Sequence, residues 1–142
     1  CLCIPRIPLS TGIYMTTPLA SSKTGLDEID RQHAQLLRCL DDLMEFVGGR
    51  YEFAAVFTAI QVLLDYVQQH FAYEENLLRS WDYPDLDKHI AGHQAIEADV
   101  RHLWVQLESG DETVTEKLVQ TIRQWILKHI NEEDIEYAKF RS

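Results

Sequence analysis

The sequence predicts an all-α protein that folds as an antiparallel up-down-up-down four-helix bundle. Apolar residues recur at intervals of three and four along four successive stretches, a pattern typical of helices that bury one face. The chain of 142 residues has prolines only at positions 5, 8, 18 and 84, so long segments contain no helix breaker. The connections between the four stretches are short, which places successive helices antiparallel.

The first two helices are expected at residues 27–47 and 52–79. The first ends at the pair Gly48 and Gly49, because glycine readily terminates a helix. The second ends in the short segment that leads to Pro84. Their expected inner faces are Ile29, His33, Leu36, Leu37, Leu40, Leu43 and Met44 or Val47 in the first, and Val56, Phe57, Ile60, Leu63, Leu64, Val67, His70, Phe71 and Glu74 in the second.

The third helix is expected at residues 85–108, where Gly110 follows as a stop signal. Thr113 and Glu116 have the spacing of a capping box, and the fourth helix then runs to about residue 137. The two inner faces are His89, His93, Ile96, Val100, Leu103 and Leu107 in the third, and Val114, Leu118, Ile122, Trp125, Ile126, His129 and Ile130 in the fourth.

The beginning of the chain differs from the remainder. Residues 1–25 show no helical period and are expected to form an irregular leader, whereas residues 26–142 form the bundle. The leader lacks the basic start, long apolar run and cleavage site of a secretory signal. The chain starts with Cys1 and Met15 is a candidate natural start, so we attribute residues 1–14 to an expression tag or an excised boundary.

Composition excludes several classes of partner. The formal net charge of −10 disfavours binding to nucleic acid or to an anionic membrane surface. No run of about 20 apolar residues is present to span a bilayer. The three cysteines have no disulfide spacing, which indicates a reducing compartment and a cytoplasmic location. Cys39 lies about 240° around the helix from His33, so we expect a partly exposed thiol remote from the site that His33 joins.

The chemistry is concentrated in one set of side chains. Five of the six histidines, with one glutamate and one aspartate, lie near those helix ends that meet at one end of an antiparallel bundle. Seven nitrogen and oxygen ligands are too many for one ion and suit two. His102 has none of these spacings and is expected at the surface. The predicted metal ligands are His33, His70, Glu74, His89, His93, His129 and Asp134.

Two of the ligand pairs have ideal helical spacing. His89 and His93, and likewise His70 and Glu74, are separated by four positions and share one helical face. A single buried histidine is usually a hydrogen-bonded core residue. Five at one level of a bundle, beside two carboxylates, would be costly to bury without cations, and this favours metal binding.

The pair His129 and Asp134 does not have this spacing. Five positions rotate a regular helix by about 140° net, so a local widening of the helix or a long reach is required. Glu133, four positions after His129, is the rival ligand on geometric grounds, and Glu75 is a weaker rival to Glu74. The sequence alone leaves both alternatives open.

The ligand types narrow the choice of metal. Imidazole with carboxylate suits iron, zinc, copper or nickel. A structural zinc site would be four-coordinate and often contain cysteine, which this set lacks. Ferritin-like di-iron proteins use E-x-x-H motifs and mostly carboxylates, which the set also lacks. A nitrogen-rich site of this kind favours reversible binding of dioxygen.

The set of motifs resembles the hemerythrin family, specifically its single-domain bacterial members, the bacteriohemerythrins. G-x-x-x-I-D-x-Q-H from Gly25 to His33 is followed by H-x-x-x-E, H-x-x-x-H and H-x-x-x-x-D, over three quarters of the chain. The combination is specific, although each motif alone is weak. The resemblance favours Asp134 over Glu133 as ligand. The family usually has an aromatic residue shortly before the glycine, where this chain has Ser22 and Lys23.

The resemblance implies two iron ions bridged by hydroxide or oxide. One iron would then have six ligands and the other five, which leaves one position for dioxygen. By this analogy His89, His93 and His129 hold the first iron, His33 and His70 hold the second, and Glu74 and Asp134 bridge them. An apolar pocket that excludes water would be lined by Leu36, Phe71, Trp125, Ile126 and Ile130, which are also core positions.

Three functions are compatible with such a centre. The first is dioxygen storage or delivery to an oxygen-using enzyme. The second is oxygen or redox sensing by a domain excised from a larger signalling protein. The third, an enzyme that reduces peroxide or nitric oxide or repairs iron centres, is disfavoured because the site offers no acid–base residue beyond the ligands.

Overall fold

The computed structural model describes residues 23–49 and 52–141, and within these ranges every regular element is a helix. The all-α prediction is confirmed. The predicted leader and its tag lie almost wholly outside the described residues. The elements are α1 (Asp27–Gly48), α2 (Phe53–Ser80), α3 (Leu86–Glu108), the 3-10 turn η1 (Glu112–Val114), α4 (Thr115–Lys128), the π-helical segment η2 (His129–Glu133) and α5 (Asp134–Arg141).

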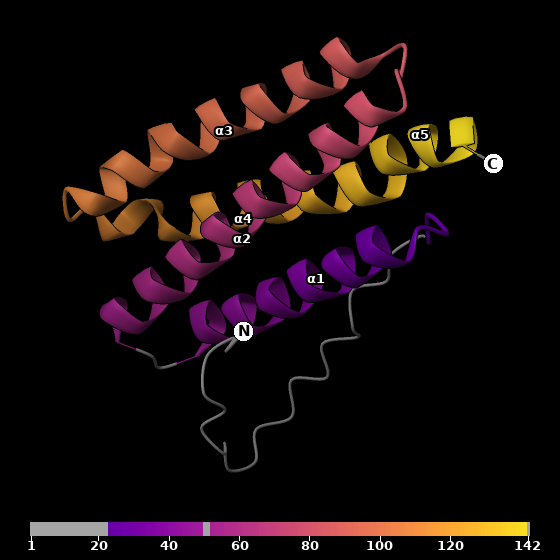
Figure 1. Cartoon of the computed structure of the whole chain (residues 1–142). Coiled ribbons are helices and arrows are strands. Elements are labelled where there is room, and N and C mark those ends of the chain that lie inside the picture. Colours follow the sequence, from indigo (N-terminus) through magenta and orange to yellow (C-terminus); the bar gives the residue numbers. More distant parts are fainter. Residues whose placement is uncertain (1–22, 50–51, 142) are drawn as a thin grey trace.

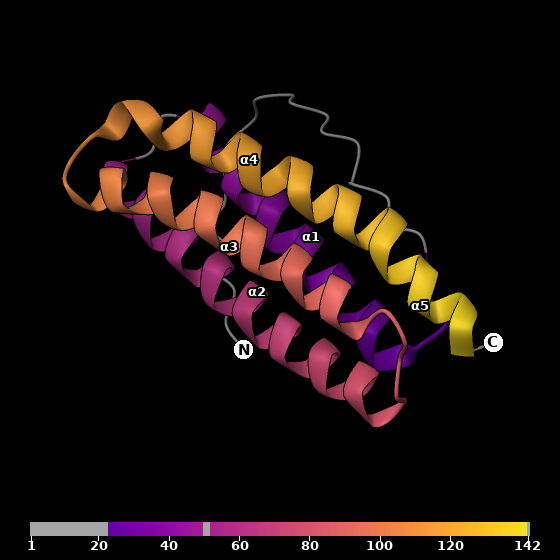
Figure 2. The ribbon, with the colours of Figure 1, turned by 90° about the horizontal axis from the view of Figure 1, so that it is seen from above.

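The helices form the predicted up-down-up-down bundle. Elements α4, η2 and α5 follow one another without a break and act as the fourth helix (Figure 1). Helix α1 packs on α2 and α4, and α3 packs on α2 and α4, so the four helices close a ring. Figure 2 shows them aligned along a common direction. The beginnings of α1 and α3 therefore lie at the same end of the bundle as the end of α2 and as α5.

The apolar residues form two separate clusters. The larger fills most of the bundle and includes Leu40, Leu63 and Ile122, each at most 1% exposed. Burying a side chain of this size contributes about 1.5–3 kcal/mol. The smaller cluster lies at the far end and centres on Leu78 and Tyr137. The predicted metal ligands lie on the four helices between the two apolar clusters. Apolar groups therefore cover these ligands on both sides.

Three smaller expectations have different outcomes. His102 is exposed, as predicted. Cys39 is only 6% exposed and belongs to the larger cluster, so the expectation of a partly exposed thiol was wrong. The reason is that α1 packs on two neighbours and buries more than a narrow stripe. Asp111, and not Thr113, begins the fourth helical segment, because its Oδ1 accepts a hydrogen bond from the Thr113 backbone N–H.

No helix within the described residues is sufficiently long and apolar to cross a membrane.

Candidate metal centre

All seven predicted ligands lie together at one end of the bundle. His89 is 9% exposed, and each of the other six is at most 1% exposed. They come from the beginning of α1, the end of α2, the beginning of α3 and the segment η2–α5, as their places in the sequence predicted. Burial of this many ionisable groups at one level requires strong mutual compensation.

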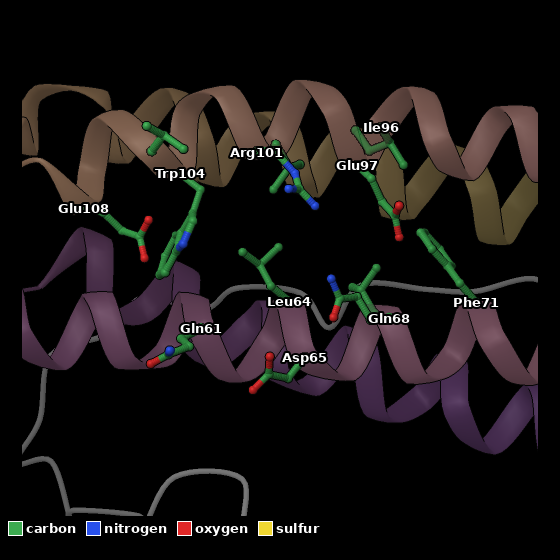
Figure 3. Close-up of a pocket in the computed structure, with 13 residues that line it drawn as sticks. Gln61, Leu64, Asp65, Gln68, Phe71, Ile96, Glu97, Arg101, Trp104 and Glu108 are labelled. Atoms are coloured by element: carbon green, nitrogen blue, oxygen red, sulfur yellow. The ribbon is translucent and has the colours of Figure 1, made fainter.

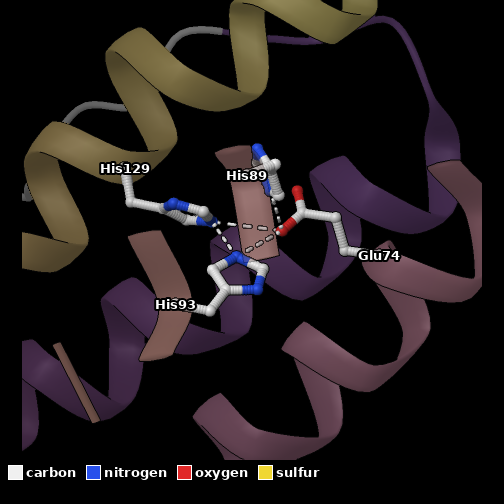
Figure 4. Close-up of side chains that lie close together, drawn as sticks. All are labelled: Glu74, His89, His93 and His129. Atoms are coloured by element: carbon white, nitrogen blue, oxygen red, sulfur yellow. Dashed lines mark hydrogen bonds and ion pairs between the residues drawn. The ribbon is translucent and has the colours of Figure 1, made fainter. Parts of the chain in front are cut away.

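Glu74 lies at the centre of a first group. Its Oε2 is 3.1 Å from His89 Nε2, 3.1 Å from His93 Nε2 and 3.2 Å from His129 Nε2 (Figure 4). The four donor atoms lie within 4.8 Å of one another, so together they could hold one metal ion. Three imidazole nitrogens and one carboxylate oxygen suit a transition-metal ion such as iron or zinc.

A second group lies beside the first. The donor atoms of His70, Glu74, His129 and Asp134 also lie within 4.8 Å of one another. His70 Nε2 is 3.8 Å from Asp134 Oδ2 and 3.9 Å from Glu74 Oε2. His33 Nε2 forms a 2.6 Å contact with Asp134 Oδ2. Because Glu74 belongs to both groups, two ions bound here would share its carboxylate.

The helix widens where the sequence required it. Residues His129–Glu133 form the π-helical segment η2, which carries an additional residue per turn. As a result His129 Nε2 lies 3.0 Å from Asp134 Oδ1, although five positions separate the two residues. Glu133 lies on the other side of the same ring, with Oε2 2.9 Å from His129 Nδ1.

The rival carboxylates occupy outer positions. Glu75 Oε1 is 2.8 Å from His93 Nδ1, just as Glu133 contacts His129 Nδ1. In a similar way, Gln32 Oε1 accepts a hydrogen bond at 2.8 Å from His70 Nδ1. Each acceptor holds the outer nitrogen and leaves Nε2 directed inward. Sequence reasoning missed these outer roles; the only signals were acidic or amide residues next to predicted ligands.

Two buried polar atoms without hydrogen-bond partners in the described part of the chain give a second reason to expect a metal at this site. His70 Nε2 and Glu74 Oε1 are buried and have no hydrogen-bond partner among the described residues. An unpaired buried polar atom costs about 1–3 kcal/mol. A cation bound between the two groups would satisfy both atoms, so the residues present suit the metal that the spacing predicts.

The cluster also carries unusual ionisation. Burial raises the pKa of the Glu74 carboxyl, but hydrogen bonds and charge interactions with His129, His89 and His93 outweigh burial and hold that pKa well below its usual value. Burial lowers the pKa of His129, but Asp134, Glu133 and Glu74 raise it well above its usual value. Glu74 and His129 therefore stabilise each other's charged forms, and the same carboxylates would stabilise a cation bound at this position.

The predicted pocket residues belong to the larger apolar cluster or pack against it, and two of them contact ligand rings. Leu36, Ile126 and Ile130 are each at most 1% exposed. The Phe71 ring stacks on the His93 ring with centroids 3.8 Å apart and an interplanar angle of 3°. Trp125 stacks on His129 at 4.6 Å and 18°. The rings of Phe71 and Trp125 therefore cover two of the three histidines of the first group. Helical spacing alone does not show which pocket residues contact which histidine.

Phe71 also lines one end of a groove between α2 and α3 (Figure 3). The groove has a volume of about 330 Å³. Trp104 lines it farther along the helices and stacks on Phe57 at a centroid distance of 4.6 Å. Phe71 both lines the groove and stacks on the His93 ring, so it is the residue that connects the groove with the histidine cluster.

The motif at the beginning of α1 fixes the position of His33. Asp30 accepts hydrogen bonds from Thr24 N and Thr24 Oγ1, both at 2.8 Å, and from Gly25 N at 3.2 Å. Gly25 has φ of +81°, a conformation that favours glycine. Ile29 is fully buried one turn before His33. This turn therefore anchors the first helix where it supplies a candidate ligand.

Comparison with known proteins agrees with this geometry. The family model described as Hemerythrin HHE cation binding domain matches residues 24–140. The chain belongs to the hemerythrin family. A bacteriohemerythrin of Pseudomonas aeruginosa (strain LESB58) is 30% identical over 115 residues, covering 81% of this chain and 74% of the relative. A bacteriohemerythrin of Methylococcus capsulatus is 27% identical over 126 residues, covering 87% and 94%. A hemerythrin-like protein of Naegleria gruberi is 28% identical over 113 residues, covering 80% and 82%.

The family assignment made from the motifs is therefore confirmed. This hemerythrin domain contains a buried cluster of histidine and carboxylate side chains that could hold a metal. The description of the family model, a cation binding domain, agrees with this.

Proposed function

We propose that this hemerythrin domain binds dioxygen reversibly at a non-haem pair of iron ions bridged by hydroxide or oxide, for oxygen storage or for delivery to an oxygen-using enzyme. The observation that supports this most strongly is the inequality of the two donor groups. The first group contains three imidazoles, His89, His93 and His129. The second group contains His70 and shares His129 with the first. We assign His129 to the first ion and His33, whose Nε2 contacts Asp134 Oδ2, to the second, so that the second ion would have two imidazoles, His33 and His70. Two ions held by unequal numbers of imidazoles would leave a coordination position open on one of them.

Each residue has a distinct task in this proposal. The five histidines present Nε2 as ligands. Glu74 and Asp134 are the shared carboxylates, because Glu74 belongs to both donor groups and Asp134 contacts both His33 and His129. When bound, the iron pair supplies the electrons for dioxygen binding. Tyr137 stays protonated, because burial and the charges of Glu74 and Asp134 raise the pKa of its hydroxyl.

The surrounding side chains exclude water. Leu36, Ile126 and Ile130 are buried one turn or less along the chain from a predicted ligand, and the rings of Phe71 and Trp125 stack on those of His93 and His129. A dry site strengthens electrostatic interactions and slows the side reactions that end reversible binding. We assign these five residues to the oxygen pocket.

The test is the absorption spectrum of the iron-loaded, reduced protein before and after exposure to air. We expect a new visible charge-transfer band, uptake of one dioxygen per two irons, and loss of the band on removal of oxygen. A centre with one iron per chain, or two irons with no spectral response to oxygen, would overturn the proposal.

We place this function in the cytoplasm, in keeping with the acidic composition and the absence of disulfide spacing. The alternative is a sensing domain, and the rate of autoxidation separates the two. Slow autoxidation with reversible binding is expected for storage or delivery, whereas rapid autoxidation that changes the output of a larger protein is expected for sensing.

A further inference from the structure

We propose that Glu75 and Glu133 are positioning residues that cause the three-histidine position to be filled first when the protein takes up divalent metal. The three-histidine position is His89, His93 and His129 with Glu74. The two-histidine position is His33 and His70 with Asp134 and Glu74. The inference rests on the proposed function, because it concerns the order in which the same cluster is loaded.

The outer contacts of the three-histidine position are carboxylates. Glu75 Oε1 lies 2.8 Å from His93 Nδ1, and Glu133 Oε2 lies 2.9 Å from His129 Nδ1. A carboxylate that accepts the Nδ1–H bond fixes the tautomer with Nε2 free to bind metal. It also makes that imidazole a stronger donor. Two of the three rings at this position have such a partner.

The two-histidine position has no carboxylate on the outer nitrogens. His70 Nδ1 meets the neutral amide oxygen of Gln32 at 2.8 Å. His33 Nδ1 is buried and has no hydrogen-bond partner among the described residues. Its Nε2 contacts Asp134 Oδ2 at 2.6 Å, which is shorter than the 3.0–3.2 Å contacts between carboxylate oxygens and the Nε2 atoms of the three-histidine position. A metal must displace this shorter contact before it can bind His33.

The inner geometry has the same asymmetry. The Nε2 atoms of His89, His93 and His129 lie 3.1–3.2 Å from the single oxygen Glu74 Oε2 (Figure 4). His70 Nε2 lies 3.9 Å from the same oxygen. The His93 and His129 rings are also held by face-to-face stacking on aromatic side chains. A preorganised donor set loses less conformational freedom on binding, so the first ion should enter here.

The experiment begins with the metal-free protein, titrated with Zn²⁺ against a competing chelator. The histidine side chains are followed by ¹⁵N NMR, which reports both tautomer and metal contact. At one equivalent we expect the signals of His89, His93 and His129 to change while those of His33 and His70 stay near their metal-free positions. At two equivalents all five should change.

Substitutions separate charge from orientation. Glu75→Gln and Glu133→Gln each retain an acceptor oxygen but remove the charge. Each should weaken the first binding step by about 10-fold, within the 10–100-fold range for such outer contacts, and leave the second step nearly unchanged. The Glu75 and Glu133 side chains are 24% and 30% exposed, so both variants should fold. Glu132→Gln, an exposed neighbour in η2, is the matched control and should change neither step.

A reciprocal variant tests the same argument at the other position. Gln32 Nε2 donates to Glu28 Oε1 at 2.8 Å, so Gln32→Glu is combined with Glu28→Gln to avoid two adjacent carboxylates. This double variant places a carboxylate on His70 Nδ1 and should strengthen the second step. The tautomer of His70, read in the metal-free protein, shows directly that the new contact forms.

The outcomes distinguish this inference from the proposed function. If His33 and His70 change first, or if both glutamine variants leave the first step unaltered, the inference is wrong even when the iron-loaded protein binds dioxygen. If loading follows the expected order but the iron-loaded protein shows no response to oxygen, the inference stands and the proposed function falls.

Discussion

His129 Nε2 lies 3.0 Å from Asp134 Oδ1, although the two residues are five positions apart on one helix. The π-helical segment between them makes this contact possible and at the same time places Glu133 against Nδ1 of the same ring. In a regular helix the residues three and four positions ahead lie beside the His129 ring, and the residue five positions ahead does not. The widened turn therefore provides an inner carboxylate and an outer carboxylate to one imidazole.

Substitution of these two carboxylates should have unequal effects. Asp134→Ala removes the carboxylate that contacts both His33 and His129, and we expect the bound iron to fall from two ions per chain to about one. Glu133→Ala removes only the outer contact and should still allow two ions. Elemental analysis of the loaded, desalted proteins measures the difference. Equal metal content in both variants would show that Asp134 is no more important for binding the second ion than Glu133 is.

Metal should stabilise the fold. An ion that binds only the native state adds about 2.7 kcal/mol at a free concentration of 100 times its Kd. For a domain of this size that corresponds to a rise in Tm of several degrees. Thermal unfolding followed by circular dichroism, with and without Fe²⁺ under anaerobic conditions, is the measurement. Glu74→Ala, which removes the carboxylate shared by both groups, is the control and should lose most of the increase.

Much of the fold could be predicted from sequence, because apolar periodicity and terminators are local signals. The first helix was expected at 27–47 and is observed as Asp27–Gly48, and the second was expected at 52–79 and is observed as Phe53–Ser80. The burial of Cys39 was missed, because it depends on how many neighbours α1 has. That is a property of the tertiary arrangement and not of the helix.

For the candidate site, too, some features could be predicted from the sequence and others depend on the tertiary structure. Spacing brings the seven ionisable groups to one end of the bundle, and it also indicates that the helix must widen between His129 and Asp134. Spacing does not say which nitrogen of a ring a neighbouring carboxylate meets. Glu75 and Glu133 were therefore weighed as rival ligands, whereas the structure places them on the outer nitrogens.

The turn that anchors α1 should make stability depend on pH. Burial raises the pKa of Asp30, but hydrogen bonds from Thr24 and Gly25 outweigh it and lower the pKa below its usual value. A carboxyl with a lowered folded-state pKa contributes stability above its unfolded pKa, near 3.9, and loses that contribution as the pH falls through the folded value.

We therefore expect Asp30→Asn to destabilise the protein by about 1 kcal/mol at neutral pH, as loss of a cap does. The difference between the variant and the original should shrink below about pH 4. Urea unfolding at a series of pH values gives both results. Asp42→Asn, an exposed carboxylate on the same helix, serves as the control. A difference that persists undiminished in acid would mean that the Asp30 charge does not act through this turn.

Phe71 should control access of water to the cluster, because its ring lines the α2–α3 groove (Figure 3) and stacks on the His93 ring. Phe71→Leu retains an apolar side chain but removes the stack, and it should cost up to about 1.5 kcal/mol of stability. The iron-loaded variant should bind dioxygen and then autoxidise faster than the original protein, which decay of the visible band measures. Phe57→Leu removes the stack on Trp104 farther along the bundle and should leave the autoxidation rate unaltered. If both variants accelerate autoxidation equally, general loosening of the bundle, and not the Phe71 ring, sets the rate.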